Sequence, residues 1–211
     1  IATYIKNSIV AVGGSTVIGV VCAALCGYGL SRYQFKGKAF LLSFLLVTQM
    51  FPAVMKIIPY YKILVSVHLN NTQIGLMVVY ASFSIPFCTW MMYGYFKSIS
   101  TGLDEAARVD GSSAFNTFLK IILPIALPGL VATIIYAFLQ NWNEYMFASV
   151  LMSADEKKTI TYAISTMADA YKIQWNYLMC AAMISSVPTL TVFVVMQKYL
   201  IAGMTAGAVK E

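Results

Sequence analysis

Charged side chains are scarce in this sequence of 211 residues. They make up 10% of it, whereas soluble domains carry about 25%. Hydrophobic residues make up 60%, and one water-soluble core cannot bury so much apolar surface. The composition therefore excludes an ordinary soluble domain and indicates a protein whose solvent is the lipid bilayer.

Motifs for nucleotide binding and hydrolysis are also absent. Gly37-Lys38 is followed by Ala39, so the phosphate-cradling G-x-x-x-x-G-K-S/T loop is missing, and neither H-E-x-x-H nor G-x-S-x-G occurs. We therefore do not expect this chain to hydrolyse a nucleotide or to be an intramembrane enzyme. Cys22 and Cys26 share a helical face, but no His or carboxylate lies near them to complete a metal site.

Long apolar runs dominate what is present. Five runs lack Asp, Glu, Lys and Arg, and they cover residues 7–31, 39–55, 63–96, 121–143 and 173–197. A helix needs about 20 apolar residues to cross a bilayer, and a barrel strand would show alternating segments of about 10 instead. The sequence therefore predicts an all-α membrane protein, with a single domain over residues 1–211 and five transmembrane helices.

The distribution of basic residues predicts the orientation. The loop over residues 31–38 carries three basic residues and no acidic one, which places it on the cytoplasmic side. Residue 1 is then outside and is not a Met, so we expect at least one more span upstream. The net charge of +6 comes from residues scattered at the ends of spans, which suits anionic lipid headgroups better than nucleic acid.

The spans themselves offer no group for moving protons or ions. A carrier driven by an ion gradient places carboxylates or histidines inside its spans, and here only His68 falls in a run, in a part expected to lie outside. This favours an energy source on another subunit. A secondary carrier or a channel subunit remains the alternative.

A polar segment over residues 101–130 interrupts the apolar runs and must lie on one face of the membrane. Thr101 and Asp104 match a capping box for a short helix that begins near Gly102, and Gly111 is suited to end it. Glu105 and Arg108 are spaced to pair along it. About two turns are too short to be stable alone, so we expect this helix to dock on a partner surface with Ala106 and Ala107.

Three further patterns bear on packing. Small residues spaced four apart in the first span predict a seam for another helix; they are Ala11, Ser15, Gly19, Ala23 and Gly27. The second span ends near Phe51-Pro52, and residues 53–71 suit an amphipathic piece in the outer interface. Pro124 and Pro128 favour a kink in the first turns of the fourth span.

Some polar and aromatic residues suit either a transport pathway or ordinary packing. The polar group at the end of the fourth span lines an aqueous path or forms the interfacial exit, and it includes Gln140, Asn141 and Asn143. Four aromatic residues are able to stack on a sugar ring or to pack in the core; they are Tyr80, Phe83, Trp90 and Tyr136.

The polar segment resembles the signature loop of the permeases of binding-protein-dependent ABC importers. That loop reads Glu-Ala-Ala, three residues, Gly, nine residues, then Ile-x-Leu-Pro, and the chain keeps every spacing from Glu105 to Pro124. Other residues are similar to the carbohydrate-type branch, namely Asp110, Phe118, Pro128, Trp142-Asn143-Glu144 and the tail from Leu200 to Val209 with Thr205-Ala206-Gly207-Ala208. The resemblance covers essentially the whole chain.

The resemblance implies a type I ABC importer transmembrane-domain fold in the bacterial inner membrane. It implies a second permease subunit, two cytoplasmic ATPase subunits that hold ATP and Mg, and an extracytoplasmic sugar-binding protein facing the loop over residues 153–172. This chain itself would bind no cofactor. Residues 101–112 would be the coupling helix, with contacts to the ATPase from Glu105, Ala106, Ala107, Arg108, Asp110 and Gly111. Leu123, Pro124 and Pro128 would complete the structural motif.

Overall fold

The computed structural model describes residues 1–167 and 175–208, with side chains up to Tyr199, and every regular element in these ranges is a helix. Three helices are long and apolar enough to cross a membrane: α1 (Ala2–Arg32), α4 (Gln73–Ser98) and α11 (Trp175–Ala208). Two bent helix pairs bring the number to as many as five, in agreement with the predicted spans. The first pair consists of α2 (Lys38–Val47), continued by η1 (Thr48–Met50), and α3 (Ala53–Ser66). The second consists of α6 (Ala114–Thr117), η2 (Phe118–Ile122) and α7 (Leu123–Ile125) followed by α8 (Leu127–Trp142).

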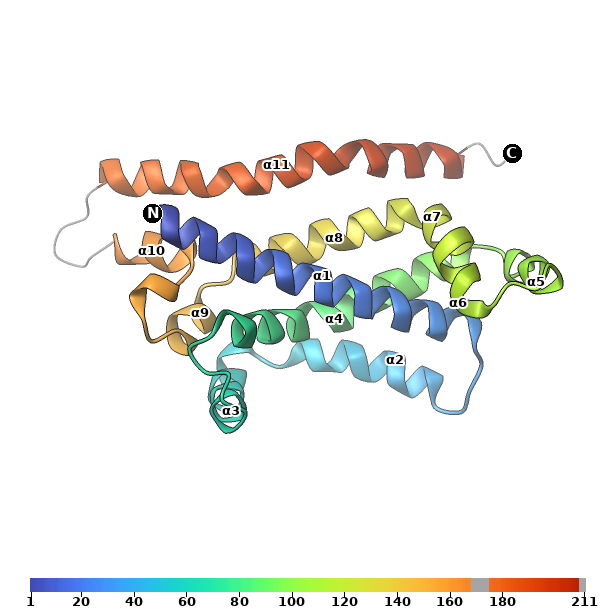
Figure 1. Ribbon diagram of the computed structural model, residues 1–211, viewed down its shortest axis with the longest axis horizontal. Coiled ribbons are helices and arrows are strands. Elements are labelled where there is room, and N and C mark those ends of the chain that lie inside the picture. The colour runs from blue at the N-terminus through green and yellow to red at the C-terminus, as the bar shows by residue number, and fades with distance from the viewer. Residues whose placement is uncertain (168–174, 209–211) are drawn as a thin grey trace.

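The remaining helices are short and lie at the two ends of the bundle. They are α5 (Gly102–Val109), α9 (Met146–Leu151), η3 (Asp155–Lys157) and α10 (Ile160–Thr166). In Figure 1, α5, α6 and α7 gather at one end, whereas α3, α9 and α10 gather at the other. We call these the α5 end and the α9 end.

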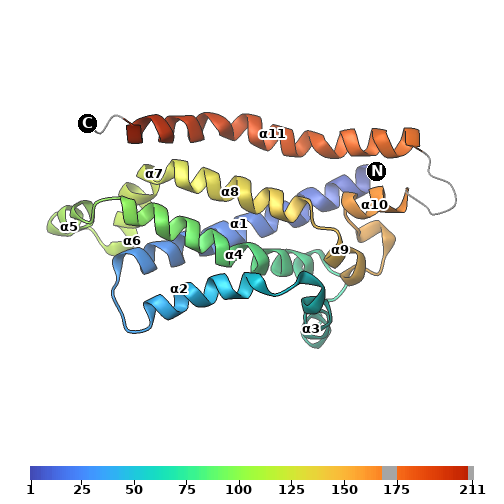
Figure 2. The ribbon, with the colours of Figure 1, turned by 180° about the vertical axis from the view of Figure 1, so that it is seen from behind.

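The long helices form one bundle around α1 and α4. These two helices run in the same direction and share the most extensive contact in the protein, and α8 packs on both. The two ribbon views place α2 beside α4 on one side and α11 beside α8 on the other (Figure 2). All of the long elements therefore end at the same two faces, as a bilayer requires.

The predicted small-residue seam of α1 is confirmed. Ala11, Ser15, Gly19, Ala23 and Gly27 are all buried. A Cβ on Gly27 would lie 2.8 Å from the Met92 Cβ and 2.9 Å from the Tyr93 nitrogen. The backbones of α1 and α4 therefore approach more closely at this point than a larger side chain would allow.

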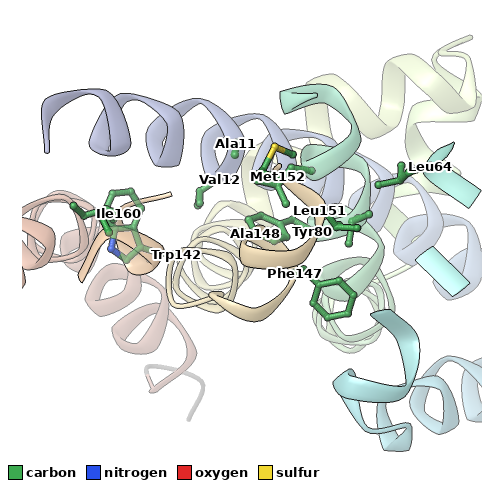
Figure 3. Packing of buried hydrophobic residues seen from close by; sticks show 13 residues of the cluster. Ala11, Val12, Leu64, Tyr80, Trp142, Phe147, Ala148, Leu151, Met152 and Ile160 are labelled. Carbon is green, nitrogen blue, oxygen red and sulfur yellow. The ribbon is translucent and has the colours of Figure 1, made fainter. Parts of the chain in front are cut away.

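Buried apolar side chains form one cluster at each end. The cluster at the α9 end joins α1, α4, α9 and α10 through residues such as Val12, Tyr80, Phe147 and Ile160 (Figure 3). The cluster at the α5 end joins α1, α4 and η2. Each group of short helices therefore has its own core against the same two long helices.

The second span ends where the sequence predicts. The helix stops at Met50, Pro52 follows, and α3 leaves at 101° to the preceding segment. Only Leu64 of α3 is buried, so the helix projects from the bundle at the α9 end (Figure 1). This geometry is expected of a helix that lies along a membrane interface.

The fourth span is bent close to its predicted beginning. Residues 115–121, where we expect the span to begin, lie before an 82° bend between α7 and α8, and the straight helix starts at Leu127 after it. Pro124 and Pro128 each occupy the first turn of a helix, where a missing N–H is tolerated. The predicted kink is confirmed as the break between the two helical segments of this bent pair.

The last span ends at Tyr199, close to its predicted end at residue 197. Helix α11 itself continues through the predicted tail to Ala208, a stretch that contains no proline to stop it. Residues 168–172 of the predicted outer loop, 173–174 of the predicted span and 209–211 of the tail lie outside the described residues.

Candidate functional site

The polar segment that organises the sequence forms a projecting two-turn helix. Helix α5 begins at Gly102 and ends at Val109, and Gly111 follows with a φ of +77°, as the predicted glycine stop requires. In both ribbon views α5 is the outermost element of its end (Figure 2). Its position leaves one side free for a partner.

The predicted capping box is wrong. Thr101 lies in the right-handed helical region and its side chain makes no capping hydrogen bond. The Ser100 hydroxyl instead accepts a bond from the Gly102 nitrogen, at 3.2 Å. Asp104 is absent from the cap because its side chain turns into the protein, where it is 6% exposed.

Asp104 faces two residues of α1. Its Oδ2 lies 2.8 Å from the Arg32 Nε, and its Oδ1 accepts a hydrogen bond of 2.5 Å from the Tyr28 hydroxyl. Both charged side chains are almost completely buried. Removing one partner of a buried ion pair costs about 3–5 kcal/mol, so this contact fixes how α5 sits on α1.

Arg32 also binds the end of α4. Its Nη1 donates to the carbonyl oxygens of Phe96 and Ile99, at 3.0 and 3.1 Å. These carbonyls lie at the helix C-terminus, where the partial negative charge of the helix attracts a cation. One guanidinium therefore joins α1, α4 and α5.

The residues predicted to touch an ATPase divide between two sides of α5. Glu105, Ala106, Arg108, Asp110 and Gly111 are exposed, whereas Ala107 is 4% exposed. Ala107 therefore packs against the rest of the chain. The ion pairs of the described residues do not include the predicted Glu105–Arg108 pair, as expected for side chains that water solvates well.

Sequence reasoning missed the apolar surface of α5. Leu103 and Val109 are 39% and 88% exposed, and Ala106 lies between them. Positions three apart share a helical face. That spacing was visible in the sequence, but the Ala106-Ala107 pair suggested a different face.

The segment after α5 stacks on the same region. Phe118 of η2 packs against Tyr28 and Phe96, with ring centroids 4.9 and 6.1 Å apart. A π-helical turn over Phe118–Ile122 leads to Leu123 and Pro124 and to the 82° bend. The predicted motif residues therefore lie where the chain passes from the α5 end into α8.

A second carboxylate, which is partly buried, holds the α9 end. Glu144 Oε2 accepts a hydrogen bond from the Tyr80 hydroxyl at 2.8 Å. Its carboxylate also accepts bonds from the backbone nitrogens of Phe147 and Ala148, at 2.9 and 3.2 Å. A carboxylate at a helix N-terminus is favoured by the free N–H groups there, so Glu144 fixes α9 against α4.

Five of the predicted pathway residues form one partly exposed strip on α4 and α8. Phe83 and Trp90 share a face of α4 with Phe87, because these positions are four and three residues apart. Tyr136 packs on Phe87, with ring centroids 4.6 Å apart. The same spacing places Gln140 and Asn143 on the face of α8 that carries Tyr136, and both are exposed.

Two other pathway candidates are core residues. Tyr80 is fully buried and serves as the donor to Glu144. Asn141 is 2% exposed and its Nδ2 donates to the Ser15 hydroxyl at 3.0 Å. Packing is therefore the role that their burial supports.

Phe83 also borders a groove of about 370 Å³ between η1, α3 and α4. Its walls include polar side chains of Gln49, Lys56 and Ser82. The Gln49 amide donates to the Phe83 carbonyl oxygen at 2.9 Å. No group of side chains able to hold a metal ion lies within the described residues.

The segment at the α9 end carries the second ion pair. Asp155 Oδ1 lies 2.9 Å from the Lys158 Nζ. This hydrogen-bonded ammonium lowers the pKa of the Asp155 carboxyl from its ordinary value. Lys158 also lies over the Tyr162 ring, 3.8 Å from its centroid, so a small charged and aromatic cluster lies at this end, with Asp155 as its well-exposed member.

The comparisons with known proteins fit this architecture. Residues 15–206 match the family described as "Binding-protein-dependent transport system inner membrane component". The chain belongs to this family and is a multi-pass permease subunit of an ABC importer in the inner membrane. In such transporters ATP hydrolysis takes place on a separate subunit. Membership of this family rules out the alternative of a secondary carrier or a channel subunit.

Individual relatives match nearly the whole chain. A "Probable ABC transporter permease protein YurM" of Bacillus subtilis is 37% identical over 210 residues, with 100% of this chain and 70% of that protein covered. The "Trehalose/maltose transport system permease protein MalG" of Thermococcus litoralis is 33% identical, with 98% of this chain and 75% of that protein covered.

A solved structure confirms the type I importer fold. In the crystal structure of a bacterial ABC transporter that imports the acidic polysaccharide alginate, one chain superposes with a TM-score of 0.77 at 25% identity. The match covers 93% of this chain and 74% of that chain. The bent fourth span and the projecting α5 therefore belong to an importer transmembrane domain.

Proposed function

We propose that this chain imports sugars or oligosaccharides and that α5 is the helix through which a cytoplasmic ATPase drives it. The observation that carries the proposal is the position of α5: an exposed two-turn helix whose inner side is fixed to α1 and α4 by Arg32 and Asp104. The relatives named for trehalose, maltose and alginate support a carbohydrate substrate.

The complete transporter would contain a second permease subunit, two ATPase subunits and an extracytoplasmic sugar-binding protein. The ATPase subunits would hold ATP and Mg, and this chain would bind neither. The exposed side of α5 offers both apolar and charged contacts to such a partner, through Leu103, Ala106, Val109, Glu105 and Arg108. Asp110 and Gly111 extend this surface beyond the end of the helix.

The strip on α4 and α8 would face the transport pathway. It combines aromatic faces, which stack on sugar rings, with the amide groups of Gln140 and Asn143. The second permease subunit would complete the pathway on that side. The Asp155–Lys158 cluster at the opposite end from α5 would face the binding protein.

The test is uptake by the assembled complex. The chain is purified with its permease, ATPase and binding-protein partners, and ATPase activity is measured with maltose, trehalose and other candidate sugars. One or more sugars should stimulate hydrolysis and accumulate in vesicles. A complex that hydrolyses ATP without response to any sugar, yet responds to another solute class, would overturn the substrate assignment.

The coupling role has its own test. Glu105→Ala or Gly111→Ala should leave the chain in the membrane but separate ATP hydrolysis from uptake. At Gly111 the cause is strain, since a side chain in the left-handed region costs about 1–2 kcal/mol. Lys36→Ala, an exposed position in the loop after α1, is the matched control. Normal uptake in both α5 variants would remove the coupling role.

A further inference from the structure

We infer that Arg32, Asp104 and Tyr28 form a link that makes α5, α1 and the end of α4 move as one body when the ATPase moves α5. This inference rests on the proposed function and deepens it, because it names the residues that carry motion from the coupling helix into the spans. None of the three faces the partner surface, so they are positioning residues.

The link is needed because α5 has little else to hold it. The helix has two turns and is too short to be stable alone. Only Asp104 and Ala107 among its residues are buried. A methyl group supplies packing but no direction, whereas the Asp104 carboxylate forms an ion pair with Arg32 and accepts a hydrogen bond from the Tyr28 hydroxyl, both on α1. The orientation of α5 relative to the spans therefore depends mainly on Asp104.

The geometry of Arg32 connects three elements at once. It lies in the last turn of α1, and its Nε and Nη1 reach Asp104 on α5 and the carbonyl oxygens at the end of α4. A guanidinium has five donors in a fixed plane, so it holds these groups at set angles. A lysine ammonium at the same place would retain the charge but could not serve both sides with this geometry.

Aromatic packing extends the link to the fourth span. Tyr28, which donates to Asp104, lies 5.7 Å from the Phe96 ring and 4.9 Å from the Phe118 ring by centroids. Phe118 opens the π-helical turn before the 82° bend. A displacement of α5 therefore reaches α1, α4 and the bend into α8 through one contiguous group of side chains.

The charges on the exposed side do not form such a connection. Within the described residues there are two ion pairs, and the other is the local Asp155–Lys158 pair at the α9 end. Glu105 and Arg108 are exposed on α5. Of the two ion pairs among the described residues, Arg32–Asp104 is thus the one that joins elements far apart in the sequence.

The experiment measures sugar molecules transported per ATP hydrolysed, per assembled complex. Asp104→Asn and Arg32→Gln each remove one charge and leave the other buried without its partner. We expect both complexes to retain the ATPase subunit and to hydrolyse ATP, while the transport ratio falls roughly tenfold, within the range typical of coupling between distant sites. Tyr28→Phe removes a single hydroxyl and should lower the ratio less.

Two further variants separate a specific link from general damage. Arg32→Gln with Asp104→Asn removes both charges, so its effect should be clearly smaller than the product of the two single effects. Arg32→Lys should recover part of the ratio lost in Arg32→Gln. Lys36→Gln, which removes an exposed charge from the loop after α1 and not from the partner surface of α5, is the control for charge loss without loss of the link.

Several outcomes would overturn the link. They are unchanged ratios in both single-charge variants, a loss of uptake that only follows the amount of assembled complex, or strictly multiplicative effects in the double variant. If the single-charge variants assemble poorly, the test rests on Tyr28→Phe and Arg32→Lys. The link is then overturned if Tyr28→Phe leaves the ratio of sugar transported per ATP unchanged and Arg32→Lys recovers none of the ratio lost in Arg32→Gln. Failure of the proposed function appears separately, as absence of sugar uptake by the unsubstituted complex, and overturns both.

Discussion

The two ends of the bundle are fixed to α1 and α4 by different kinds of contact. At the α5 end, one guanidinium and one carboxylate carry most of the polar attachment. At the α9 end, many separate hydrogen bonds join side chains and backbone groups, and the side chain is the donor in some and the acceptor in others. Their side chains belong to Asn7, Ser8, Asn71, Gln73, Glu144, Lys157 and Thr161.

This difference indicates different mechanical roles. A segment held at many points keeps its shape when one contact is lost, so the α9 end acts as part of the bundle. A short helix held mainly through one buried ion pair depends on that pair for its position relative to α1 and α4. The difference fits the proposed roles, in which the α5 end transmits a displacement and the α9 end keeps its position relative to α1 and α4.

Both ends of the bundle are fixed to α1 and α4, so disrupting the seam between these two helices should cause the largest loss of stability. In Gly27→Val the new Cβ would lie within 3 Å of the Met92 Cβ and the Tyr93 nitrogen, so the α4 backbone has to shift. We expect a loss of about 3 kcal/mol, at the upper end of the cost of overpacking. Thermal unfolding of the purified complex measures it.

Gly29→Val is the matched control for this change. Gly29 lies on the same helix two residues later, and a Cβ there meets nothing within 4 Å. Its unfolding temperature should stay close to that of the unsubstituted complex. Equal losses in the two variants would mean that valine in α1, and not contact with α4, is responsible.

The second-largest loss of stability is expected in Glu144→Ala, which tests whether Glu144 fixes the α9 end. Glu144→Ala removes the acceptor for the buried Tyr80 hydroxyl and for two backbone nitrogens of α9. A buried polar group without a partner costs about 1–3 kcal/mol, so we expect a loss of about 2 kcal/mol. Amide exchange should accelerate in α9, and the thermal unfolding temperature should fall.

Glu156→Ala provides the control for Glu144→Ala. Glu156 is an exposed carboxylate at the same end, and its backbone oxygen, which Asn7 binds, is unaffected by the substitution. Exchange in α9 should be unchanged. If both variants accelerate exchange equally, net charge at this end matters more than the hydrogen bonds of Glu144.

Most of the architecture was predictable from the sequence because membrane spans depend on length and composition. The predicted runs locate α1, α4 and α11, and the four-residue spacing of small side chains locates the seam. Gly111 was predictable as well, because few residues tolerate its positive φ. These features depend on neighbouring residues along the chain.

The attachment of α5 was not predictable in the same way. Asp104 matches a helix cap by local spacing, but its partner Arg32 lies 72 positions earlier in the sequence. Asp104 forms this long-range ion pair instead of a local cap. The spacing of residues along the sequence cannot predict such a contact. The strip on α4 and α8 was predictable only in part, since Tyr80 and Asn141 have suitable side chains but lie in the core.

A smaller effect tests whether the contacts at the α9 end are distributed. Asn7→Ala removes two hydrogen bonds to the Glu156 and Lys158 carbonyl oxygens, and Gln73→Ala removes one to Lys157. Each hydrogen bond contributes about 1 kcal/mol, so exchange should accelerate around residues 154–160 while sugar uptake per ATP stays unchanged. A fall in that ratio as large as in Asp104→Asn would contradict the division of roles between the two ends.

The smallest effect concerns the Asp155–Lys158 pair and its dependence on pH. The Lys158 ammonium lowers the pKa of the Asp155 carboxyl, so the folded state favours the ionised form. This contribution is complete above the ordinary aspartate pKa of about 3.9 and is lost as the pH falls through the lowered value. The difference in unfolding temperature between the unsubstituted protein and Asp155→Asn should therefore be present near neutral pH and should shrink in acid. Because Asp155 is well exposed, the difference should be the smallest of the four, and a difference that grows in acid would show that the pair does not stabilise this end.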